Sequence, residues 1–211
     1  MNVNSKLKEY VEREIIPRYD NFDKAHQRNH VIEVIRQSMQ LAQLYDVNVN
    51  MVYAIAAFHD TGLCRGREYH HIASAAILRD DKMIDELFSA DEINIMAEAI
   101  EDHRASGSSA PRTLYGRIVA EADRVIDGNV ILRRTVQYGL SNYPALSREE
   151  HFIRVCEHLH EKYAEGGYLK LWIPESGNAE NLRLFRKIID DKQQLRRLFD
   201  AIFDEETDGY M

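Results

Sequence analysis

Apolar residues recur at intervals of three and four along almost the whole chain, and this spacing limits the fold more than any other feature of the sequence. Residues three and four apart lie on the same face of an α-helix, so each such stretch predicts a helix whose apolar face packs against other helices. Strands would instead show alternation of apolar and polar residues, and no convincing pair of such stretches occurs. The sequence therefore predicts an all-α fold.

Capping signals and loop residues mark where the predicted helices begin and end. Ser89 with Glu92 and Ser147 with Glu150 are capping boxes, in which each side chain serves the other residue's backbone amide. Pro17 is expected to end the first helix. The expected helices cover about residues 6–16, 26–45, 51–58, 70–78, 91–104, 113–126, 147–165, 179–190 and 192–203, with polar loops at 61–68 and 106–111.

Composition limits the class of protein. The chain has 211 residues and a net charge of −8, a length that suits one helical domain over 1–211 with an elaboration. The acidic charge argues against a dedicated nucleic-acid surface. Its two cysteines form no CxxC pair, which favours a reducing compartment. No signal peptide and no apolar run of membrane length are evident, so we expect a cytoplasmic protein that does not enter a membrane. The oligomeric state stays open.

Nine histidines stand beside those two cysteines, and several lie on the inward faces of the predicted helices together with two aspartates. A single histidine on an apolar face is usually a hydrogen-bonded core residue. Five helices that repeat the placement would bury several polar groups at once, and a metal ion would satisfy them together. Imidazole and carboxylate ligands favour zinc, manganese, iron, cobalt or nickel over calcium. The inward residues are His30, His59, Asp60, His70, His103 and Asp123.

The sequence around the inward residues of three of these helices resembles the motifs of a known protein family. The segments "NHVIEVI" around His30, "AIAAFHDTG" around His59 and Asp60, and "IVAEADRVI" around Asp123 are similar to the motif helices of the HD-domain superfamily, metal-dependent phosphohydrolases with a helical core. The resemblance covers about residues 20–132. It implies an HD-domain helical bundle, with additional C-terminal helices over about 143–211 as an elaboration.

The resemblance extends to the branch of the family that holds two metals. "YHHIASAAIL" places His70, and "AEAIEDHRAS" places His103, where that branch has further histidine ligands. The resemblance thus implies six ligands (His30, His59, Asp60, His70, His103 and Asp123) for one or two divalent ions of manganese, iron, cobalt, nickel, zinc or magnesium. Asp60 would bridge the two metals of the binuclear form. The two-histidine dipeptide that some binuclear relatives carry at the second of these positions is absent, since Asp102 precedes His103 and Arg104 follows it.

These residues would support hydrolysis of phosphoric ester or anhydride bonds. The expected nucleophile is a metal-bound hydroxide, with His59 and Asp60 as the catalytic core and no covalent intermediate. Cations near the metals would bind the phosphate. The candidates for substrate binding are Arg104, Arg112, Arg124 and His26, although a solvated helix residue explains each arginine as well. Arg65 and Arg67 lie in the loop 61–68, which is either a gate to the site or an exposed connector.

Three functions remain in competition at this level. The first is a metal-dependent phosphohydrolase that acts on a small phosphate ester, a nucleotide or a phosphoanhydride. The second is an HD-type oxygenase with a mixed-valent di-iron centre, which oxygen consumption with bound iron would reveal. The third is a non-catalytic nucleotide-sensing module with a structural metal, for which His59→Ala should melt the fold as well as remove the metal.

Overall fold

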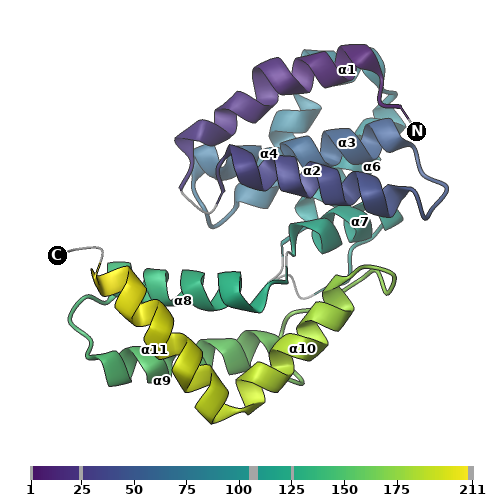
Figure 1. Ribbon diagram of the computed structural model, residues 1–211. Helices are drawn as coiled ribbons and strands as arrows, with labels where there is room; N and C mark the ends of the chain where they lie inside the picture. The colour runs from purple at the N-terminus through teal and green to yellow at the C-terminus, as the bar shows by residue number, and fades with distance from the viewer. Residues whose placement is uncertain (1, 24–25, 105–108, 125, 209–211) are drawn as a thin grey trace. The chain divides into compact units, whose positions relative to one another are not determined.

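The computed structural model describes residues 2–23, 26–104, 109–124 and 126–208, and within these ranges the chain forms helices and no strand (Figure 1). The all-α prediction is confirmed. Residues 106–108 of the predicted loop 106–111 lie outside the described residues. Every described helix is either too short or too polar to cross a lipid bilayer.

The chain divides into two compact units, and each is described here by itself. The first comprises Met1–Arg124 with Trp172–Ser176, and the second comprises Val125–Leu171 with Gly177–Met211. The grouping of all residues into one domain stays a prediction.

The first unit is a bundle of short helices. Its core is α3, which is buried from Met51 to Phe58 and lies against α2, α6 and α7. In Figure 1, α2 and α3 run side by side below α1. The helices of this unit are α1 (Ser5–Tyr10), η1 (Val11–Ile15), η2 (Ile16–Asn21), α2 (Arg28–Ala42), α3 (Val49–Phe58), η3 (Thr61–Arg65), α4 (His70–Arg79), α5 (Lys82–Leu87), α6 (Ala90–Glu101) and α7 (Leu114–Asp123).

The described residues of the second unit form four helices, of which α9 begins with the predicted capping box of Ser147 and Glu150. Its helices are α8 (Gly128–Asn142), α9 (Arg148–Tyr163), α10 (Asn178–Asp190) and α11 (Lys192–Asp208). Helix α8 was not among the predicted elements. Its start, Asp127-Gly128-Asn129, is typical of a turn, yet the Asp127 carboxylate caps the helix by accepting from two of its first amides.

The first helical segment differs from its prediction. Pro17 does not end it, because the chain continues as the 3₁₀ helix η2, where Pro17 occupies the first turn and needs no amide partner. The continuation matters because it carries Tyr19 into the core, where the side chain is 0% exposed. The short helix α5, capped by Asp81, was also absent from the prediction.

One glycine allows two elements of the first unit to touch. The Gly62 amide donates to the Ser74 hydroxyl at 2.8 Å, so the turn after α3 lies directly on α4. A Cβ at residue 62 would lie 2.2 Å from the His70 carbonyl oxygen and 2.5 Å from the Ser74 amide nitrogen, and both are backbone atoms. Only glycine therefore allows this approach, which sets the position of the start of α4.

We expect Gly62→Ala to destabilise the protein. The added methyl group forces the turn and α4 apart, at a cost of about 1–3 kcal/mol in the free energy of unfolding. Thermal unfolding followed by circular dichroism measures the effect. Gly177→Ala is the control, because a Cβ there meets nothing within 4 Å and the φ of −63° suits alanine. Equal melting temperatures for the two variants would contradict the prediction.

Candidate metal centre

The HD dipeptide lies where the buried helix α3 ends. His59 is the C-cap of α3 and Asp60 follows in the turn, with the two residues 0% and 3% exposed. Tyr19 holds this turn in place, because its hydroxyl donates to the Ala57 carbonyl at 2.9 Å and accepts from the Asp60 amide at 3.2 Å. The end of a largely apolar helix thus places an imidazole and a carboxylate in the interior.

A first set of ligand atoms gathers around one oxygen of Asp60. His30 Nε2 lies 3.3 Å from His59 Nε2 and 3.7 Å from Asp60 Oδ2, and His59 Nε2 lies 3.4 Å from the same oxygen. Asp123 Oδ1, at the end of α7, completes the group at 3.2 Å from His30 Nε2 and 3.8 Å from His59 Nε2. Helices α2, α3 and α7 therefore converge on one point.

A second set faces the other oxygen of Asp60. His70 Nε2 lies 3.2 Å from Asp60 Oδ1, and His103 Nε2 lies 3.5 Å from it. The two imidazole nitrogens are 3.2 Å apart. His70 begins α4 and His103 follows the end of α6, so this set comes from different helices than the first.

The spacing within both sets suits a metal ion. Ligand atoms about 2.1 Å from an ion, at angles of 90–109°, are separated by about 3.0–3.4 Å. The distances above are similar to or slightly longer than these. The histidines and aspartates fit a divalent ion, and the carboxylate of Asp60 offers one oxygen to each set. The structure brings together all six predicted ligands, whose role as ligands stays a prediction.

Backbone carbonyls fix the tautomers of three histidines. His59 Nδ1 lies 2.8 Å from the Ala56 carbonyl oxygen, and His103 Nδ1 lies 2.6 Å from that of Ile100. His70 Nδ1 lies 2.7 Å from the Arg67 carbonyl oxygen. A carbonyl only accepts, so each Nδ1 carries the hydrogen and each Nε2 offers its lone pair to the centre. This arrangement is typical of histidines that bind metals.

The charges of the centre depend strongly on one another in the absence of metal. Burial by itself lowers the pKa of His30, but hydrogen bonds to Asp123 and Asp60 raise it from 6.5 to about 10. Burial opposes the ionised form of both aspartates, yet the surrounding imidazoles hold the pKa of Asp60 and of Asp123 below the ordinary value. His70 differs, because burial and the neighbouring His103 lower its pKa.

The four predicted substrate-binding residues occupy different surroundings. His26 lies just before α2 rather than within it, is bonded to Asp23 at 2.8 Å, and has its ring 5.7 Å from that of His30. The Arg104 guanidinium donates to the Glu68 carbonyl at 2.6 Å, near the start of α4. Arg124 is 7% exposed and donates to the Ala120 carbonyl of its own helix.

Arg112 is held by carboxylates. Its guanidinium forms ion pairs with Glu101 at 2.7 Å and Asp102 at 3.0 Å, and a longer one of 3.7 Å with Glu98. These contacts fasten the segment before α7 to the end of α6. Phosphate binding by Arg112 would require it to leave these partners.

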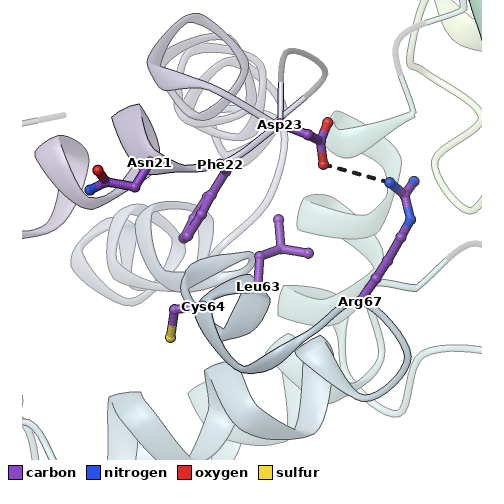
Figure 2. A pocket seen from close by; sticks show the side chains of 6 residues that line it. All are labelled: Asn21, Phe22, Asp23, Leu63, Cys64 and Arg67. Atoms are coloured by element: carbon purple, nitrogen blue, oxygen red, sulfur yellow. Dashed lines mark ion pairs between the residues drawn. The ribbon is translucent and has the colours of Figure 1, made fainter. Parts of the chain in front are cut away.

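A pocket of about 350 Å³ lies between the end of η2 and η3 (Figure 2). Phe22 and Leu63 form apolar walls, and Asp23 and Arg67 form an ion pair of 3.6 Å at its rim. Both rim residues connect to the metal centre. Asp23 bonds to His26, which lies against His30, and the Arg67 carbonyl accepts from His70. The pocket is lined by Asn21, Phe22, Asp23, Leu63, Cys64 and Arg67.

Sequence reasoning missed two buried polar residues on the elements that carry the centre. Tyr19 follows a proline in a segment expected to leave the helix, so nothing in the local pattern indicated its burial. Glu121 is 0% exposed and accepts hydrogen bonds from residues about 50 positions later. Its place within the apolar run "IVAEAD" was a usable signal, because a carboxylate on a buried helix face needs a partner.

The raised pKa of His30 gives the metal-free protein a pH dependence. Its pKa rises from 6.5 to about 10 on folding, so protonation stabilises the fold fully below about pH 6.5 and this stabilisation is lost as the pH rises to 10. We expect the melting temperature of chelator-treated protein to fall over this range. His30→Gln should flatten the profile, and an equally steep profile in that variant would count against the assignment.

Comparison with protein families matches residues 28–126 to the HD domain. The matched segment begins with α2 and contains all six predicted ligands, from His30 to Asp123. Searches among curated proteins and among solved structures found no match. HD domains are generally metal-dependent hydrolases, and the cluster of histidines and aspartates described above fits a metal site of that family. Residues 28–126 of this chain are therefore an HD domain.

Proposed function

We propose that this protein hydrolyses the phosphoric ester or anhydride bond of a small phosphorylated substrate, at two divalent ions held by the six clustered residues. Bound divalent ions supply a water of lowered pKa as the nucleophile and positive charge for the phosphoryl oxygens. The family membership supports a metal-dependent hydrolase. The family match does not give the number of ions, the bond that is cleaved or the substrate, and these three are parts of the proposal.

The observation that carries the proposal is the orientation of Asp60. Its Oδ2 lies 3.4 Å from His59 Nε2, whereas its Oδ1 lies 3.2 Å from His70 Nε2. If Asp60 bound a single ion, its other oxygen would not need a second pair of histidines around it. Two separate sets that share Asp60 instead match the binuclear sites that bind both the attacking and the leaving oxygen of a phosphoryl group.

The protein's own residues orient these ligands and bind the phosphate. The carbonyl partners of His59, His70 and His103 hold each imidazole ring in place, so that each Nε2 points inward before a substrate binds. Arg104 follows His103 in the sequence, and its guanidinium donates to the Glu68 carbonyl, two residues before His70. We assign the phosphate contact to Arg104 rather than to Arg112, whose charge is already matched by carboxylates.

The pocket in Figure 2 suits the part of the substrate that does not react. Its apolar walls, Phe22 and Leu63, can cover a ring or a carbon chain, while Arg67 at the rim is 73% exposed in its side chain and can turn toward an anionic group. Two hydrogen bonds link residues of the pocket to histidines at the centre: Asp23 bonds to His26, whose ring lies 5.7 Å from that of His30, and the Arg67 carbonyl accepts from His70.

The first test of the proposal measures metal content and activity together. Protein purified without chelator should contain two divalent ions per chain, and manganese- or cobalt-loaded protein should hydrolyse members of a panel of phosphate esters and nucleotides. His70→Ala should retain one ion and lose at least about 10²-fold in kcat, since a ligand and a source of positive charge are removed. His160→Ala, at an exposed histidine of α9, should change neither quantity.

Two results would contradict the proposal. Full metal loading without turnover of any phosphorylated compound would overturn the hydrolytic activity, and oxygen consumption by the iron form would indicate the di-iron oxygenase instead. A single ion per chain in the wild type, with an unchanged count in His70→Ala, would overturn the binuclear centre.

The second test concerns Arg104. Removing a charged hydrogen-bond donor to a phosphate costs about 1.5–3 kcal/mol, so Arg104→Ala should lower kcat/KM by about 10- to 100-fold at full metal occupancy. Arg36→Ala is the matched control, because Arg36 is a surface residue of α2 paired with Glu33. Unchanged kinetics in Arg104→Ala would remove this residue from the substrate site.

A further inference from the structure

A short segment far along the chain belongs to the same compact unit as the metal centre. We call Trp172–Ser176 the strap. It contains a turn at Pro174 and Glu175, and it lies well outside the residues that match the HD domain. The chain leaves the first unit after Arg124 and returns to it only for these residues.

A buried carboxylate fastens the strap to α7. Glu121 Oε2 accepts from the Trp172 amide at 2.6 Å and from the Ile173 amide at 3.3 Å. Its other oxygen, Oε1, accepts from the Ser176 hydroxyl at 2.5 Å. Glu121 is 0% exposed, so these donors replace the water that an ionised carboxylate loses on burial. These hydrogen bonds indicate a structural role for the Glu121 carboxylate. The proposed reaction assigns it no part.

The strap also packs against the other helices that carry the first ligand set. Ile173 is buried together with Ala42 of α2, Val52 of α3 and Ile118 of α7. The Tyr45 hydroxyl, just after α2, donates to Glu175 at 2.7 Å. The strap therefore contacts α2, α3 and α7, which place His30, the HD dipeptide and Asp123. His70 and His103 come from α4 and from the end of α6.

Helix geometry links the fastening to the metal centre. Residues two apart on an α-helix are about 200° apart around its axis, so Glu121 and Asp123 leave α7 on nearly opposite sides. Glu121 points to the strap, and Asp123 Oδ1 lies 3.2 Å from His30 Nε2. A shift or rotation of α7 that released the strap would move the Asp123 carboxylate by a similar amount.

We propose that Glu121 is a positioning residue for the first ligand set, because it locks α7 to the strap and so holds Asp123 in register with His30, His59 and Asp60. The inference rests on the metal centre of the proposed function but not on any substrate. The strap, which lies outside the segment that matches the HD domain, thus supports the metal centre of that domain. Loss of the support should weaken the first set and spare the second.

The test measures metal affinity in folded, full-length protein. All variants carry His70→Ala, which removes a ligand of the second set and leaves the first set complete. Chelator-treated protein is then titrated with Mn²⁺ by calorimetry. We expect Glu121→Ala to weaken binding by about tenfold or more, since a displaced ligand costs at least one tenfold step in affinity. Glu121→Gln keeps one carbonyl acceptor for the strap amides and should restore part of the affinity.

Controls separate positioning from general destabilisation. Ile84→Ala removes a side chain that is 0% exposed from α5, which carries no ligand, and should lower the melting temperature without changing the Mn²⁺ affinity. Where Glu121→Ala does not fold, Ser176→Ala removes one donor from the half-buried end of the strap and should weaken binding by a smaller factor.

The experiment separates failure of this inference from failure of the proposed function. A folded Glu121→Ala or Ser176→Ala protein that binds Mn²⁺ as tightly as its parent would overturn the inference and leave the metal centre intact. A wild-type protein that binds no Mn²⁺ would overturn the centre itself and the inference with it. Equal weakening by Ile84→Ala would also overturn the inference, because stability alone would then explain the loss.

Discussion

The first unit depends on keeping the carboxylate of Asp60 in its interior among four imidazoles. Transfer of an ionised carboxylate from water into such a site is costly unless charges and hydrogen bonds compensate. The compensation comes from His30, His59, His70 and His103, with Asp123 as a second acid. Without metal, the raised pKa of His30 shows that a proton supplies part of this compensation. A divalent ion in each ligand set would supply it more completely.

The rest of the unit is arranged so that these side chains meet. Helix α3 is buried on all sides and ends at the HD dipeptide, Tyr19 bonds to both sides of the turn, and Gly62 lets α4 approach it. Carbonyls at the ends of helices then fix the histidine tautomers. The orientation of the ligands therefore comes from backbone groups, which move less than side chains, and this is the rigid support that a metal centre needs.

The arginines near the centre show why the surroundings decide function. Arg104, Arg112 and Arg124 carry the same charge and lie close to ligand residues in the sequence. Arg112 is neutralised by the acids at the end of α6, and burial lowers the pKa of Arg124, whose guanidinium turns back to its own helix. Arg104 instead donates to the Glu68 carbonyl, two residues before His70.

The sequence by itself determined the helical class and the two capping boxes, and it predicted the six residues that cluster at the candidate metal centre. These features are local: the helical period, Ser89 with Glu92, and a His-Asp dipeptide at the end of an apolar stripe can each be recognised within a few residues. Only the tertiary structure decided that the two oxygens of Asp60 face different histidine pairs, that Tyr19 holds the turn, and that Glu121 binds the strap. The contacts of Tyr19 and Glu121 join residues 38 to 55 positions apart through backbone groups and hydroxyls, which leave no periodic signal in the sequence.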